Sequence, residues 1–107
     1  MDKLALLKLI LADDTKSQTS EAESFLEIGK VYAIRTVTMI YTGRLIKINH
    51  QELLIDEAAW IPDTERWADF VATGAHKEAE PYTNPVVINR GAILDCTVIP
   101  SVIRKQK

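Results

Sequence analysis

The sequence predicts a mainly β domain with an N-terminal α-helix and a short helix inserted between strands. Short segments rich in β-branched and aromatic residues follow one another with brief polar turns between them, a pattern that favours antiparallel strands. Of the 107 residues, 47% are apolar, which is enough for a buried core in a single domain of this length. We therefore expect five short strands in one body over residues 25–103.

Composition limits the function classes. The formal net charge is −2 and the sequence pI is about 5.6, values that disfavour a general phosphate-binding surface. The single cysteine cannot form an internal disulfide, which fits the cytoplasm. The longest apolar stretch, residues 4–12, is interrupted by Lys8 and is far shorter than the roughly 20 residues of a membrane span. We expect no signal peptide, because no small-residue cleavage site is present.

Residues 1–12 are predicted to form the N-terminal helix, since they are strong helix formers without glycine or proline. An isolated helix of about 11 residues is marginal in water and must dock on an apolar surface. One interpretation is that the helix covers the core of its own domain, and a second is that it docks on a neighbouring subunit or another protein. A third is a membrane surface, for which the polar face of the helix is narrow. The expected contacts are Leu4, Leu7, Ile10 and Leu11.

A polar linker over residues 13–24 separates this helix from the body. Its first eight residues can span roughly 15–25 Å, so the helix can reach beyond its own domain. This reach keeps docking on a partner open as an alternative to docking on its own core.

In the body, residues 31–41 predict a first strand, Thr42-Gly43 a turn, residues 44–49 a second strand and residues 53–59 a third. These three strands form an antiparallel meander with short connections. Residues 86–89 and 92–99 predict a fourth and a fifth strand, and residues 104–107 a frayed basic tail.

A helical insertion is expected at about residues 63–74. Asp63 is placed to cap a helix over residues 64–73, in which Trp67, Phe70 and Val71 share one face. Gly74 then ends the helix, and residues 75–84 read as a polar loop.

Two segments resemble the motifs of the Sm-like family. TGRLIKINHQELLIDEA (residues 42–58) resembles the first Sm motif, and VVINRGAILDCTVI (residues 86–99), with Arg90-Gly91, resembles the second. The segment from Trp60 to Asn84 is inserted between them. The resemblance implies a five-stranded Sm-like (SH3-like) bent-sheet barrel whose edge strands pair between copies into a closed ring. The body is also similar to a group of small phage- and prophage-associated bacterial proteins of no established activity.

The Sm-like resemblance implies a nucleic-acid rim on two turns, with the candidate residues Asn49, His50, Gln51, Asn89 and Arg90. Such side chains hydrogen-bond or stack on bases and pair with phosphate. Glu52 and the net charge of −2 disfavour RNA. For Arg90, stabilising a turn or a contact between subunits is the competing role.

Metal binding and catalysis are not expected. His50, His76 and Cys96 lack ligand spacing, and Cys96 reads as a buried, inert thiol. Asp56 and Glu57 would point to opposite faces of a strand, while Asp63 and Glu65 fit helix capping. We expect no cofactor.

The sequence therefore predicts a non-enzymatic, homo-oligomeric structural subunit, cytoplasmic or in a phage-type particle assembled there. Its partners would be copies of itself and a protein bound by the N-terminal helix, and a single-stranded RNA-binding ring protein is the alternative. Trp60, Trp67 and Phe70 read as a core cluster or as interface anchors. The candidate assembly contacts in the body are Trp60, Trp67, Ile93, Val98 and Ile99.

Overall fold

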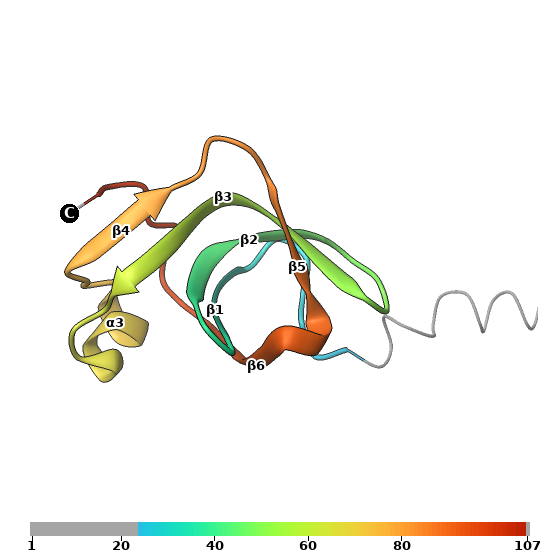
Figure 1. The fold of residues 1–107 in the computed structure, drawn as a ribbon, viewed down its shortest axis with the longest axis horizontal. Helices are drawn as coiled ribbons and strands as arrows, with labels where there is room; N and C mark the ends of the chain where they lie inside the picture. The colour runs from blue at the N-terminus through green and yellow to red at the C-terminus, as the bar shows by residue number, and fades with distance from the viewer. Residues whose placement is uncertain (1–23, 107) are drawn as a thin grey trace, which may run out of the picture.

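The computed structural model describes residues 24–106 as one bent antiparallel sheet with one α-helix (Figure 1). The mainly β fold is thus confirmed, whereas the predicted N-terminal helix and most of the linker lie outside the described residues. The elements in chain order are β1 (Val31–Thr36), β2 (Ile40–Ile48), β3 (Glu52–Asp63), α3 (Trp67–Thr73), β4 (Glu78–Pro81), β5 (Val86–Asn89), the 3₁₀ turn η2 (Arg90–Ala92) and β6 (Ile93–Val98).

The sheet has six strands rather than the expected five, in the order β4-β3-β2-β1-β6, and β5 also pairs with β3. All pairs are antiparallel. The first part of β3 (residues 52–55) pairs with β5, and its last part (residues 59–63) pairs with β4. The long strand β3 therefore holds two short strands on one side. Between β5 and β6, the described residues form no ladder, so the sheet is open.

The two parts of β3 are separated by a bulge at Glu57, whose φ is +53°. Before the bulge, Leu53 and Ile55 face one core cluster; after it, Ala58 faces that same cluster while Ala59 and Ile61 face the other. Alternation along a strand has a period of two, so one extra residue shifts every later side chain to the opposite face. The bulge lets one strand contribute to two cores.

Gly43 lies inside β2, opposite Tyr32, and the predicted turn at Thr42-Gly43 is wrong. The chain turns instead between Thr36 and Met39, where the Thr36 N–H donates to the Met39 carbonyl (2.8 Å) and the Met39 N–H donates to Thr36 Oγ1 (3.0 Å). A Cβ at position 43 would lie 2.9 Å from Ile55 Cδ1 and 3.1 Å from the Asp56 carbonyl oxygen. A glycine is needed here because β2 and β3 approach closely, and not because the chain turns.

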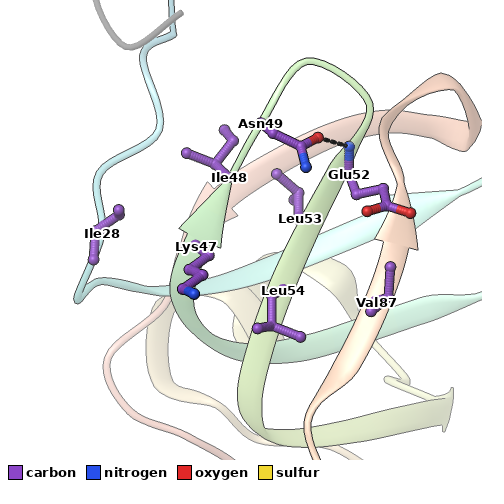
Figure 2. Close-up of a pocket in the computed structure, with 8 residues that line it drawn as sticks. All are labelled: Ile28, Lys47, Ile48, Asn49, Glu52, Leu53, Leu54 and Val87. Carbon is purple, nitrogen blue, oxygen red and sulfur yellow. Dashed lines mark hydrogen bonds between the residues drawn. The ribbon is translucent and has the colours of Figure 1, made fainter. Parts of the chain in front are cut away.

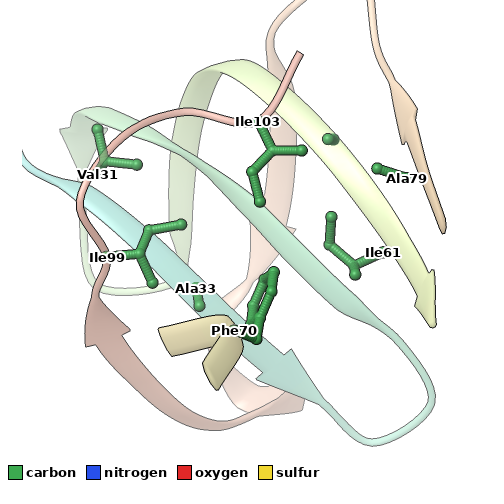
Figure 3. Packing of buried hydrophobic residues seen from close by; sticks show 8 residues of the cluster. Val31, Ala33, Ile61, Phe70, Ala79, Ile99 and Ile103 are labelled. Atoms are coloured by element: carbon green, nitrogen blue, oxygen red, sulfur yellow. The ribbon is translucent and has the colours of Figure 1, made fainter. Parts of the chain in front are cut away.

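Two clusters of buried side chains cover opposite faces of β1. The helix-side core gathers around Phe70 under α3 (Figure 3) and contains Val31, Ala33, Ala59, Ile61, Phe70, Ala79, Ile99 and Ile103. The β5-side core lies within the bend of the sheet and contains Tyr32, Ile34, Leu45, Leu53, Ile55, Ala58 and Ile88. Because both faces of β1 are buried, its first four residues are apolar without alternation.

Helix α3 confirms the predicted apolar face and C-terminus. Phe70 is fully buried, Trp67 and Val71 pack beside it, and the Gly74 N–H donates to the Phe70 carbonyl (2.7 Å) at a φ of +88°. The predicted start is wrong. Asp63 ends β3, and its carboxylate accepts the Glu65 N–H (2.8 Å) in a turn before the helix begins at Trp67.

The predicted loop at residues 75–84 contains β4, the strand that the sequence did not predict. The C-terminal segment, predicted to be frayed, runs beside β4. The Ala79 N–H donates to the Gln106 carbonyl (3.3 Å) and Ile103 is buried. Arg104 donates to the Ala58 carbonyl (2.7 Å) and the Tyr82 carbonyl (2.8 Å). The guanidinium thus ties the C-terminal segment to β3 and to the chain after β4.

We expect Gly43→Ala to lower the free energy of unfolding by about 1–3 kcal/mol, because the added methyl group overpacks the contact with Ile55 and the Asp56 carbonyl. Urea denaturation of the full chain measures this. The matched control is Gly91→Ala, where the nearest atom to the new Cβ is a side-chain oxygen, Asn89 Oδ1, at 3.2 Å. Equal effects of the two substitutions would contradict the close-approach role of Gly43.

Candidate functional site

The two turns that the sequence singled out meet at one end of the sheet. The β2–β3 turn carries Asn49 and Gln51, and the β5–β6 turn carries Arg90. The Arg90 N–H donates to the Gln51 carbonyl (2.8 Å), and its guanidinium donates to the Asn49 carbonyl. The structure therefore brings these candidate residues together, as the rim prediction requires.

Several polar groups of these joined turns are already used within the chain. Asn49 Oδ1 accepts the N–H groups of Gln51 (2.7 Å) and Glu52 (2.7 Å). Asn89 Oδ1 accepts the Gly91 N–H (2.8 Å). These are local side-chain-to-backbone bonds that define turn geometry, and His50 lies exposed at the tip. The arrangement is well suited to holding the two turns at a fixed angle.

Strands β5 and β6 each pair on one side only within residues 24–106. The Ile99 N–H donates to the Val31 carbonyl (3.0 Å). Since backbone groups alternate in direction along an antiparallel strand, those of Cys96 and Val98 point away from β1. Beside these free edges, apolar side chains are exposed: Val87 on β5 is 57% exposed, and Leu94 and Val98 on β6 are 68% and 50% exposed.

The other predicted assembly contacts in the body differ in how deeply they are buried. Ile99 is only 3% exposed and belongs to the helix-side core, and Ile93 packs beside the β5-side core. Trp67 stacks near Phe70 (5.5 Å between ring centroids), with the Arg35 guanidinium 4.5 Å from its centroid. Trp60 is half-buried and lines a pocket of about 360 Å³ with, among others, Val37, Met39 and Leu94. Of these four candidates, Trp60 contributes to a surface pocket.

Several titratable groups make contacts within the chain. Asp56 accepts the Glu57 N–H (2.9 Å), and Glu57 pairs with Arg44 (2.8 Å) across the bulge. Burial, above all, raises the pKa of the Cys96 thiol to about 11, so this partly buried group stays protonated at neutral pH. Within residues 24–106, no group of three histidine, cysteine or carboxylate side chains is arranged to hold a metal ion.

Comparisons with known proteins return no matching family model, curated protein or solved structure. In the described part of the chain, no helix has the length and apolar composition that crossing a bilayer requires.

Sequence reasoning missed the apolar residues that line a second pocket, chiefly the exposed Ile28 and Val87 and the half-buried Leu54. The sequence does contain a signal that β3 and β5 have apolar residues on both faces. Residues 53–55 and 86–88 are continuous apolar runs, and such runs lack the polar alternate positions of a strand with one solvated face.

A pH-dependent contribution to stability is expected from Asp95. The bidentate hydrogen bonds from Arg35 hold the pKa of this carboxyl group below its usual value. Because the folded pKa is depressed, the stabilisation is present above the unfolded pKa of about 3.9 and is lost as pH falls through the folded pKa. The difference in unfolding free energy between the native chain and Asp95→Asn should therefore shrink below about pH 4.

Thermal unfolding at pH 7 and at pH 2–3, which lies below the unfolded pKa of about 3.9, measures this difference. Glu78→Gln, at an exposed carboxylate on β4, is the matched control and should show no comparable trend. A difference for Asp95→Asn that is constant across this range would refute the assignment.

Proposed function

We propose that the chain is a homo-oligomeric assembly subunit, in which the free edge of β5 in one copy pairs with the free edge of β6 in the next. The observation that carries the proposal is that both edges are unpaired within the described residues and are flanked by exposed apolar side chains, Val87, Leu94 and Val98. Such edges pair with whatever matches them.

The edges lack two of the features that keep monomeric sheets apart, although β5 is short, with four residues, and β6 has a register shift opposite Arg35 and Thr36. Soluble proteins protect edge strands with charges, especially lysine, or with proline inside the strand. Strand β5 has neither, and the one charged residue of β6, Asp95, is engaged by Arg35 at its neighbouring strand. Little electrostatic repulsion therefore opposes pairing between copies.

Two different edges that pair head to tail generate a ring when the rotation between copies closes. The Sm-like resemblance of residues 42–58 and 86–99 supports this outcome. The order of the elements along the chain also supports a ring. Both α3 and β4 lie within the segment Trp60–Asn84, which is inserted between the two motifs. Without that insertion, five strands remain, three before it and two after it.

We expect the full chain to be larger than its 12.0 kDa monomer mass at micromolar concentration, and Val98→Lys to lower that mass. The new ammonium group would have to be desolvated at the paired edge. Static light scattering after size exclusion measures the mass. The control is Ala72→Lys, which adds the same charge at an exposed position of α3, an element that belongs to neither edge. A monomeric native chain refutes the proposal.

Single-stranded RNA binding at the joined turns is the second candidate function, favoured by the meeting of Asn49, Gln51 and Arg90. Against it, the Arg90 guanidinium already donates to a carbonyl, and Glu52 adds negative charge beside the turn. We therefore expect no tight binding of an oligonucleotide at physiological salt, measured by fluorescence anisotropy. Salt-sensitive binding that is lost in both Arg90→Ala and His50→Ala would reverse this ranking.

A further inference from the structure

A groove of about 350 Å³ lies at the end of the sheet that carries the β2–β3 turn, close to the first described residues (Figure 2). Five of its eight lining residues are apolar, and the others are Lys47, Asn49 and Glu52. Ile28, which precedes β1, and Val87 on β5 stand at its two sides, with residues of β2 and β3 between them. A second hollow of about 420 Å³ shares Ile28 and Ile48 with it and includes Ser24 and Leu26. The groove thus extends to the point where the described chain begins.

The floor of the groove is a row of cross-strand neighbours. Lys47 on β2 is opposite Leu54 on β3, which is opposite Val87 on β5. Residues in register share one face of a sheet, and these three lie on the face opposite Ile88 of the β5-side core. Ile48 and Leu53, which pack in that core, border the groove at the end of the sheet. Ile28 and Val87 are 58% and 57% exposed. Apolar side chains collected in a hollow, rather than scattered, mark a docking surface.

The chain itself contains a segment of matching chemistry just before this place. Residues 4–11 include six leucine and isoleucine side chains, and residues 13–23 between them and the groove are mostly polar. These eleven residues span at most about 40 Å, which is sufficient to reach the groove of its own chain or that of an adjacent one.

The distribution of these apolar residues decides whether the segment docks in the groove of its own chain or in that of an adjacent chain. At helical spacing, Leu4, Leu6, Leu7, Leu9, Ile10 and Leu11 fall on nearly every side of the wheel. A shallow groove on one chain covers one side of such a segment and leaves the others in water. Between two copies, the groove covers one side and the adjoining subunit another.

We propose that the groove binds residues 4–11 of a neighbouring copy, an inference that rests on the homo-oligomeric function proposed above. The segment acts as an exchanged arm, and the groove residues Ile28, Ile48, Leu54 and Val87 receive it. Val87 borders both the groove and the free edge of β5, so the arm lies beside the strand contact and reinforces the same pair of subunits.

Disulfide trapping between two full-length variants tests this arm exchange. In a Cys96→Ser background, a Leu7→Cys chain is mixed with an Ile28→Cys chain under mild oxidation, and the mixed disulfide is quantified by mass spectrometry. Only contact between copies forms it. We expect a yield at least about tenfold above that of Leu7→Cys mixed with Val37→Cys, because docking concentrates the thiols locally. Lys8→Cys, which removes no apolar side chain, repeats the measurement.

Light scattering on the same samples separates the two proposals. An oligomer with equal yields for Ile28→Cys and Val37→Cys overturns the arm exchange and leaves the edge-paired assembly standing. An oligomer in which the double variant Leu7→Cys/Ile28→Cys forms only an intrachain disulfide also overturns the exchange, since the arm then docks on its own chain. A monomer overturns the homo-oligomeric function and the exchange with it.

Discussion

The fold depends on the bulge in β3 at Glu57 and on the close approach that Gly43 allows opposite it. A regular twelve-residue strand would present one set of side chains to one face along its whole length. The bulge exchanges the faces midway, so that Ile55 and Ala58 meet the same cluster and Ala59 and Ile61 meet the other. Strand β3 can then pair with β5 in its first part and β4 in its last.

The close approach of β2 and β3 leaves one buried polar group without a hydrogen bond. Thr42, between Ala33 and Ala59 in the ladder, is fully buried, and its hydroxyl finds no partner in the structure. A buried hydroxyl without a hydrogen bond costs about 1–3 kcal/mol. Small residues surround this hydroxyl: Ala33 and Ala59 are fully buried, and Gly43 lets β2 and β3 approach closely.

The sequence predicted the parts of the fold whose local pattern and tertiary role agree. Trp67, Phe70 and Gly74 specify an amphipathic helix and its end, and the structure has both. It could not predict β4, because Glu78–Pro81 buries only Ala79 and owes its strand pairing to β3 and the C-terminal segment. Gly43 was misread because a turn and a tight strand crossing demand the same residue. The structure brings Asn49 and Arg90, two residues of the candidate rim, into contact. The groove at Leu54 and Val87, in contrast, is formed only when two distant strands come into register.

In the proposed assembly, the joined turns acquire a mechanical role that nucleic-acid contact does not require. The two edges belong to β5 and β6, which follow one another through η2. Arg90 binds this connection to the β2–β3 turn through its own N–H and its guanidinium, and Asn89 closes it through the Gly91 N–H. The angle between the two edges is thereby held by hydrogen bonds within one subunit. Since that angle sets the rotation from each copy to the next, these hydrogen bonds would give every copy the same rotation, and the size of that rotation decides between a closed ring and an open fibre.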